Sequence, residues 1–82
     1  NQFNASIKLV FANNSKELSL FSDVEIRKLS LRIFDLNGRL IKVKSLNNIK
    51  ESNWSLKFLP KGFYIASVKI NDKIKNLKFV IN

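Results

Sequence analysis

The chain contains neither cysteine nor histidine, and it has only one proline and two glycines among its 82 residues. Without cysteine and histidine, Ser-His-Asp and Cys-His catalysis, thiolate zinc sites and imidazole metal ligands are excluded within this chain. Disulfides cannot supplement the core, so hydrophobic packing has to hold the fold together. The six acidic residues are scattered, and a chain of this length offers little cleft for a paired-carboxylate hydrolase. We therefore expect no enzyme activity, no cofactor and no metal.

Long apolar runs are also missing, so the sequence predicts no membrane-spanning segment. The apolar fraction of 45%, with seven Phe, one Trp and one Tyr, is that of a folded chain. A domain this small buries only about 60 to 65 percent of its unfolded surface, so its stability margin is thin. The opening Asn1-Gln2-Phe3 has no basic and apolar export signal, which indicates a piece of a longer precursor with any such signal upstream.

Apolar residues recur at every second position along most of the chain, which is the pattern of half-buried β-strands. From Phe3 to Phe11 every second residue is apolar, while Asn4, Ser6 and Lys8 fall on the opposite face. Stretches of this kind at roughly ten-residue spacing predict seven short strands. They cover residues 3–11, 18–20, 29–33, 41–43, 54–58, 64–70 and 77–81.

Turn-forming residues separate several of these stretches. Asn37-Gly38 predicts a type I′ turn, with both residues at positive φ, that folds residues 29–35 back on residues 39–46. Asn71-Asp72 predicts a second hairpin between the last two strands. The bend at residues 60–62, which contains the proline and a glycine, predicts a crossing of the chain from one sheet to another.

Together these patterns predict an all-β fold, specifically a seven-stranded antiparallel Ig-like β-sandwich. Residues 22–25, Ser-Asp-Val-Glu, match a helix capping box and leave room for one helical turn at most. On the apolar phase of the strands, Phe3, Phe11, Trp54, Phe58 and Tyr64 are expected in the core. Phe34 and Phe63 fall off this phase beside turns; exposed contacts are one role for them, and covering the open end of a sandwich is the commoner one.

The net charge of +9 is the compositional feature that points to a partner, because such a field attracts nucleic acid, anionic lipid or acidic polysaccharide. The lysines, however, recur on the polar faces of nearly every strand, where they also protect strand edges from aggregation. A nucleic-acid module would expose aromatic side chains among its lysines, whereas most aromatic residues here fall on the core phase. We therefore expect no nucleic acid as partner, and membrane association only through partner proteins.

Three sequence blocks carry a resemblance to a known family. They are residues 33–41 (Ile-Phe-Asp-Leu-Asn-Gly-Arg-Leu-Ile), residues 59–64 (Leu-Pro-Lys-Gly-Phe-Tyr) and residues 78–81 (Lys-Phe-Val-Ile). In order and spacing they resemble the hairpin, L-P-x-G-x-Y and terminal-strand blocks of C-terminal sorting domains of the type IX (Por) secretion system, type A-like, of Bacteroidota. The resemblance extends from about residue 11, where Ala12 and Asn14 replace the customary prolines of the opening block, to Asn82.

The resemblance implies that residues 1–82 are one C-terminal sorting domain, with residues 1–10 as its first strand or the end of a linker and residues 11–82 as its core. It implies a signal that directs an upstream cargo through the periplasm and across the outer membrane, for secretion or display at the cell surface. The implied partners are the outer-membrane translocon, a β-barrel shuttle protein and a sortase-like peptidase that removes the domain and attaches the cargo to lipopolysaccharide.

We expect seven residues to carry recognition, the glycines by setting turns and the two cations by presenting charge. They are Gly38, Arg39, Pro60, Gly62, Tyr64, Lys78 and Phe79. For Tyr64 and Phe79, plain core packing is the stronger expectation. Two alternatives from other classes stay open: an Ig-like accessory or adhesion module of a cell-surface protein, and a basic nucleic-acid-binding β-domain. Processing is expected in the linker near or before Phe3, because a cut inside a strand needs unfolding.

Overall fold

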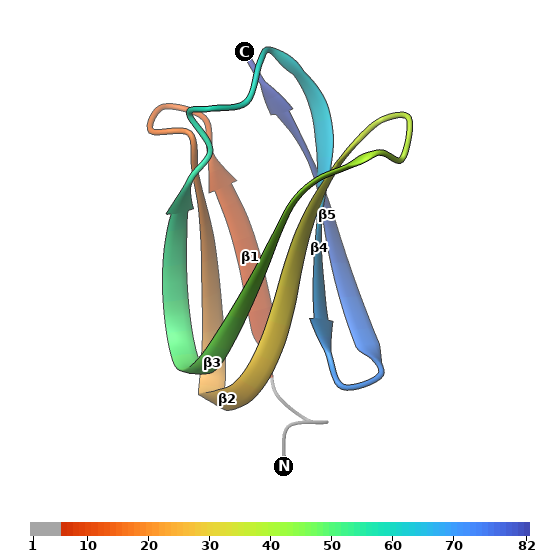
Figure 1. Cartoon of the computed structure of the whole chain (residues 1–82). Helices are drawn as coiled ribbons and strands as arrows, with labels where there is room; N and C mark the ends of the chain where they lie inside the picture. The colour runs from red at the N-terminus through yellow and green to blue at the C-terminus, as the bar shows by residue number, and fades with distance from the viewer. Residues whose placement is uncertain (1–5) are drawn as a thin grey trace.

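A computed structural model of the chain describes residues 6–82, which form a single antiparallel β-sheet that curls on itself (Figure 1). The strands in chain order are β1 (Ile7–Ala12), β2 (Glu17–Asp35), β3 (Leu40–Ser55), β4 (Gly62–Ile70) and β5 (Lys73–Ile81). Within the sheet the order is β1-β2-β4-β5, and β3 pairs with β2. The alternating apolar residues predicted this all-β antiparallel architecture, and the structure confirms it.

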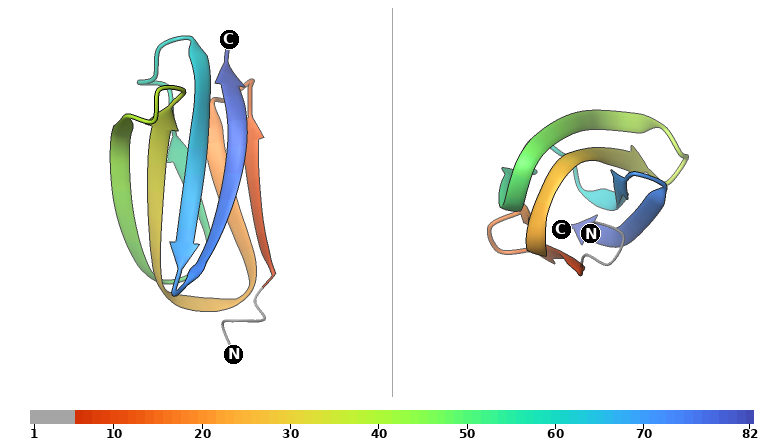
Figure 2. Two further views of the ribbon diagram at one scale, coloured as in Figure 1. Left: turned by 90° about the vertical axis from the view of Figure 1, so that its right-hand side faces the viewer. Right: turned by 90° about the horizontal axis from the view of Figure 1, so that it is seen from below.

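The sheet curls because its two longest strands bend. The first part of β2 pairs with β1 and with the last part of β3, whereas its second part lies between the first part of β3 and β4. The ladder between β2 and β3 is interrupted between Phe21 and Ile26, and Asn48 in the facing strand has a positive φ of 55°. The two halves of the sheet therefore face each other across the core, as the end-on view in Figure 2 shows.

The predicted seven strands and the Ig-like sandwich are not confirmed, because residues 6–82 contain five strands. Predicted strands 18–20 and 29–33 are both parts of β2, and 41–43 with the first two residues of 54–58 belong to β3. The alternation fails at the bend of β2, where Val24 and its neighbours are exposed, although the backbone stays extended. Residues 22–25 are accordingly strand and not a helical turn. The Ser22 hydroxyl accepts a hydrogen bond from the Val24 N–H (3.2 Å) and donates one to its carbonyl (2.6 Å).

The core lies between the two halves of the sheet and contains no buried polar or charged residue among those described. The largest of its fully buried side chains come mainly from β2, with Val68 from β4; they are Leu18, Leu20, Ile26, Leu29, Ile33 and Val68. β1 and β5, the two ends of the strand order, approach each other on one side of the molecule. There the Phe11 and Phe79 rings pack with centroids 4.6 Å apart, and the Lys75 Nζ donates to the Ile7 carbonyl at 2.7 Å.

The aromatic residues expected in the core have mixed outcomes. Trp54 and Tyr64 are buried, and Phe11 is half-buried against the core. Phe58 is 53% exposed, so its assignment to the core was wrong. The reason is that β3 ends before it, so the alternating pattern no longer fixes the side on which its ring lies. Phe3 lies outside the described residues.

The connections between strands explain the remaining predictions. Ile70 pairs with Lys73 across the predicted Asn71-Asp72 hairpin, in which Asn71 alone has a positive φ (56°). Residues 56–61 carry the chain from the edge strand β3 to β4, which lies on the other side of β2. The chain thus crosses at Pro60 as expected, but between the two halves of one sheet and not between two sheets. No helix in residues 6–82 is long and apolar enough to cross a bilayer.

Candidate recognition surface

The structure brings the three sequence blocks together on neighbouring strands at one end of the sheet. Asp35, in the hairpin block, is opposite Tyr64 of the second block, and Tyr64 is opposite Phe79 of the terminal block. One position along, Ile65 is opposite Lys78. The blocks are separated along the chain, yet β2, β4 and β5 place them side by side, as the left view of Figure 2 shows for these strands.

The hairpin between β2 and β3 is organised by Asp35. Its carboxylate Oδ1 accepts hydrogen bonds from the N–H groups of Asn37 and Arg39, each at 2.9 Å. The Gly38 N–H donates to the Asp35 carbonyl (3.1 Å), and the Asp35 N–H donates to the Arg39 carbonyl (3.0 Å). An aspartate that binds the following backbone N–H groups fixes a turn without help from the sheet.

The turn differs from the predicted type I′ turn, because only Gly38 has a positive φ (83°) and Asn37 does not. The extra residue is accommodated by a bulge: Ile33 pairs with Lys42, but Phe34 pairs with Leu40. A longer hairpin loop with one left-handed glycine and a bulge is a common alternative to the two-residue turn.

Arg39 projects from this hairpin into solvent, with 79% of its side chain exposed. Its Nε lies 3.2 Å from the Asp35 Oδ2. An exposed ion pair of this kind contributes at most about 1 kcal/mol to stability, so the pair orients the guanidinium more than it holds the fold. The guanidinium has four further N–H donors besides the Nε–H group, and the exposure of the side chain leaves them accessible.

The second block forms a corner closed by Tyr64. Its hydroxyl donates a 2.6 Å hydrogen bond to the carbonyl of Pro60, four residues earlier. Gly62, at a φ of 152°, lies over the Tyr64 ring, whose nearest atoms would be 3.8 Å from a Cβ at that position. The ring itself is buried, with 6% exposure. A tyrosine that hydrogen-bonds back to the backbone a few residues upstream is known from β-sandwich domains, where it fixes the entry of a strand.

The terminal block divides between the two faces of β5. Phe79 is buried and packs on Tyr64, with ring centroids 5.8 Å apart, and on Phe11. Lys78 is exposed on the outer face, opposite Ile65. Of the seven residues expected to carry recognition, Tyr64 and Phe79 are therefore parts of the core, Gly38, Pro60 and Gly62 set backbone geometry, and Arg39 and Lys78 present charge to solvent.

Comparison with known families shows to which family the chain belongs. Residues 4–82 match the model of a family described as "Secretion system C-terminal sorting domain". The chain belongs to this family. It is a sorting domain of the type IX secretion system, the family that the three blocks indicated. No curated protein matches the chain.

Membership defines the general role of the sorting domain. It is a C-terminal signal for type IX secretion, which directs a cargo to the cell surface or the medium and interacts with the secretion machinery. Domains of this kind are cargo signals and not catalysts. Within residues 6–82 no group of three or more acidic residues could hold a metal ion.

Sequence reasoning missed a patch of apolar side chains on the outer face of the sorting domain. Phe34 lies opposite both Leu40 and Ile65, and Phe63 lies opposite Val80 on the same face. These five residues, which we call the outer patch, cross four neighbouring strands at the end where the three blocks meet. Phe63 is 57% and Leu40 47% exposed.

The outer patch changes the interpretation of the two aromatic residues that fell off the core phase. Phe34 and Phe63 lie on the outer face of the sheet, where covering the end of a sandwich does not explain them. The predicted two-residue turn at Asn37-Gly38 pairs Phe34 with Ile41, so the observed pairing of Phe34 with Leu40 depends on the bulge and was not a usable signal in the sequence. The pairing with β4 and β5 could not be inferred from that hairpin.

Proposed function

We propose that the secretion machinery recognises the sorting domain at the end of the sheet where the three blocks meet. Arg39 and Lys78 contact the partner directly, on either side of the outer patch. Gly38, Pro60, Gly62, Tyr64 and Phe79 act indirectly, because they hold the hairpin, the corner and β5 in place. The observation that carries this proposal is the register, which pairs Asp35 with Tyr64 and Ile65 with Lys78 on adjacent strands.

The chemistry of this end favours a protein partner. Exposed aromatic and aliphatic residues beside cations are typical of docking surfaces, whose centre is apolar and whose rim is charged. The acidic residue nearest the patch, Asp35, is already engaged by Arg39 and the hairpin backbone. The surface offered to a partner is thus apolar and positive, and it fits an apolar surface with an acidic rim.

In the route that we propose, residues 1–82 act as one unit. The translocon and its β-barrel shuttle bind this unit, and a sortase-like peptidase removes it after export. Cleavage falls in the linker near or before Phe3, ahead of β1, because a cut inside a paired strand would need unfolding. Phe3 lies outside the described residues, so this site stays a prediction.

The direct-contact residues can be tested by secretion of a fluorescent cargo that carries the sorting domain. We expect Arg39→Ala with Lys78→Ala to lower the secreted fraction, since both side chains are exposed and their loss leaves the core intact. The matched control is Lys28→Ala with Lys69→Ala, which removes the same charge from exposed positions outside the three blocks. Thermal unfolding of the purified parent domain and the two double variants verifies that stability is unchanged. Equal secretion of the two double variants would sink the contact proposal.

A further inference from the structure

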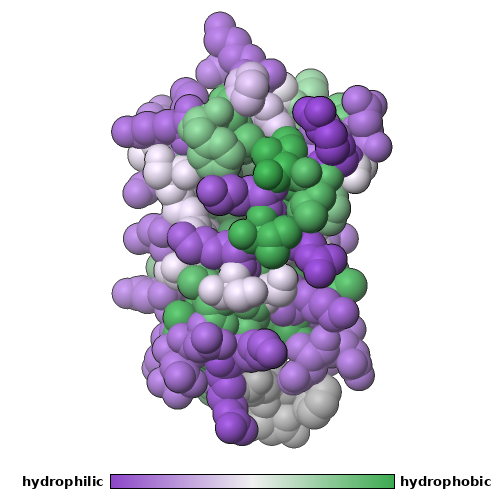
Figure 3. Space-filling view, viewed as in Figure 1, coloured by the Kyte–Doolittle hydropathy of each residue, from purple (hydrophilic) through white to green (hydrophobic). Residues whose placement is uncertain are grey.

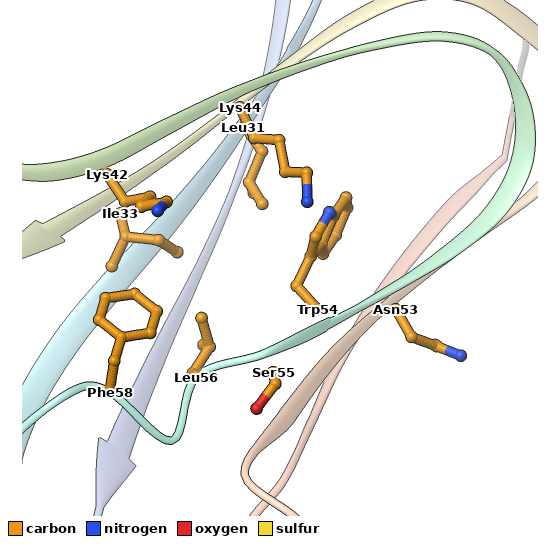
Figure 4. A pocket seen from close by; sticks show the side chains of 9 residues that line it. All are labelled: Leu31, Ile33, Lys42, Lys44, Asn53, Trp54, Ser55, Leu56 and Phe58. Carbon is orange, nitrogen blue, oxygen red and sulfur yellow. The ribbon is translucent and has the colours of Figure 1, made fainter.

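A second surface feature lies at the open edge of the sheet, away from the three blocks' outer face. It is a groove of about 280 Å³ between the first half of β3 and the segment that ends it, which we call the β3 groove (Figure 4). Its floor consists of the core residues Leu31 and Ile33, and its far wall of Trp54, Leu56 and Phe58. The groove therefore gives access from solvent to the apolar interior.

The near wall of the groove carries two lysines that point toward the core side of the sheet. Lys42 is opposite Ile33 and Lys44 is opposite Leu31, and directly opposite residues share a face. Figure 4 shows both ammonium groups reaching over the groove. The Lys42 Nζ lies 5.5 Å from the centroid of the Phe58 ring, within the range of a cation–π contact.

The polar groups that face the β3 groove are hydrogen-bond donors. Lysine ammonium and indole N–H groups donate only, and the side chains of Asn53 and Ser55 turn away in Figure 4. No Asp or Glu of the described part of the chain lines the groove. Two positive charges over an apolar floor, with no carboxylate among the lining residues, select an occupant that brings its own acceptors and negative charge.

The backbone beside the groove is also free to pair. β3 is hydrogen-bonded to β2 along one edge only, so among residues 6–82 its other edge has no strand partner. This edge borders the groove on the face shown in Figure 3, where apolar side chains gather between polar ones. A strand added there would send alternate side chains into the groove opposite Lys42 and Lys44, and those between them outward beside Val43.

We propose that the β3 edge and groove bind an extended segment of a partner protein with the alternation acidic–apolar–acidic. The segment adds as an antiparallel strand to residues 40–46, its two carboxylates pair with Lys42 and Lys44, and its apolar side chain covers Val43, which is 47% exposed. This site adjoins the surface proposed for recognition at Leu40 but uses the edge of β3 and the core side of the sheet, and its test does not depend on secretion.

Size and charge argue for this occupant over two others. At about 280 Å³ the groove is at the lower limit for a small-molecule site but holds one or two side chains. A second copy of the chain would bring another set of lysines to the same edge, and inward-pointing charge on an edge strand is a known barrier to such pairing. The same barrier is lifted by a strand that carries carboxylates.

Binding can be measured on the isotope-labelled 82-residue chain by NMR titration. The probe is the capped peptide acetyl-Thr-Glu-Val-Glu-Val-Thr-amide, and the comparison probe has Gln in place of both Glu residues. We expect shifts at the amides of residues 40–46 and at the indole N–H of Trp54, which lines the groove. Loss of two ion pairs predicts about tenfold weaker binding of the Gln peptide, or of the Glu peptide to Lys42→Gln with Lys44→Gln.

The control variant Lys28→Gln with Lys69→Gln lowers the net charge equally and is expected to bind the Glu peptide as the parent does. Equal weakening of both double variants would mean that charge attracts the peptide without a site, and would overturn the proposal. Shifts at other strands, or no shift at Trp54, would overturn it as well. A titration with dodecanoate, an apolar anion, would overturn the proposal if it shifted the Trp54 signal when the peptide did not. Sedimentation that showed self-association through the β3 edge would overturn it too.

Discussion

Replacing Tyr64 by Phe removes one atom from the corner of the sorting domain and tests what that corner contributes. The variant keeps the ring under Gly62 and against Phe79, but it loses the 2.6 Å hydrogen bond to the Pro60 carbonyl. Because Pro60 is exposed, water can replace the lost donor, and the expected loss of unfolding free energy is about 1 kcal/mol. For a domain of this size that corresponds to a melting temperature lower by about 4–8 °C.

This loss leaves the variant folded at room temperature, since an 82-residue domain has a total stability of about 4 to 12 kcal/mol. Urea unfolding, followed by the fluorescence of the buried Trp54, measures the change directly. In a secretion assay at a permissive temperature the variant should be exported like the parent, because the hydroxyl faces Pro60 and not a partner. An unchanged urea midpoint would refute the stabilising role of the corner, and a folded variant that is not exported would show that the hydroxyl is itself a contact.

Three further predictions follow from the same structure. Gly38→Asn should lower the free energy of unfolding by less than about 1 kcal/mol, because asparagine tolerates the left-handed region. Gly62→Asn, at a φ of 152°, should lower it by about 1–3 kcal/mol. Equal losses of the two variants in urea unfolding would contradict this difference in backbone strain. Phe63→Ser should change stability by no more than about 0.5 kcal/mol yet lower secretion, while Ile74→Ser, equally exposed but outside the outer patch, should leave secretion unchanged. Leu20→Ala, at a fully buried position, should cost about 2–5 kcal/mol and leave a partly unfolded domain by circular dichroism.

The alternating apolar residues predicted most of the strands, because each strand buries one face and exposes the other, and the turn residues predicted the hairpins that join β2 to β3 and β4 to β5. The sequence did not predict that β2 and β3 continue through their bends. At the bend of β2 the side chains are exposed, so hydrophobic alternation stops, while backbone pairing on either side of it keeps the chain extended. Alternation records burial of side chains and not hydrogen bonding of the backbone, so it divides a bent strand into two.

The candidate site was predictable in composition but not in arrangement. Arg39 and Lys78 could be named from the blocks that carry them, and Tyr64 and Phe79 from the core phase. The outer patch and the β3 groove depend on which strands become neighbours in the sheet. β2 pairs directly with β4, although β3 comes between them in the sequence. Asp35 was missed as the organiser of the hairpin, although an aspartate before Asn-Gly is a signal for a turn fixed by its side chain.

The most direct test of the central claim is export of a fluorescent cargo that carries an export signal and residues 1–82 as its C-terminus. The assay compares a host with a working type IX translocon and the same host without one. The account predicts cargo at the cell surface or in the medium only when the translocon works, and its loss when residues 71–82, which contain β5, are deleted. Retention in the periplasm of both hosts would contradict it and would favour an adhesive or structural module instead.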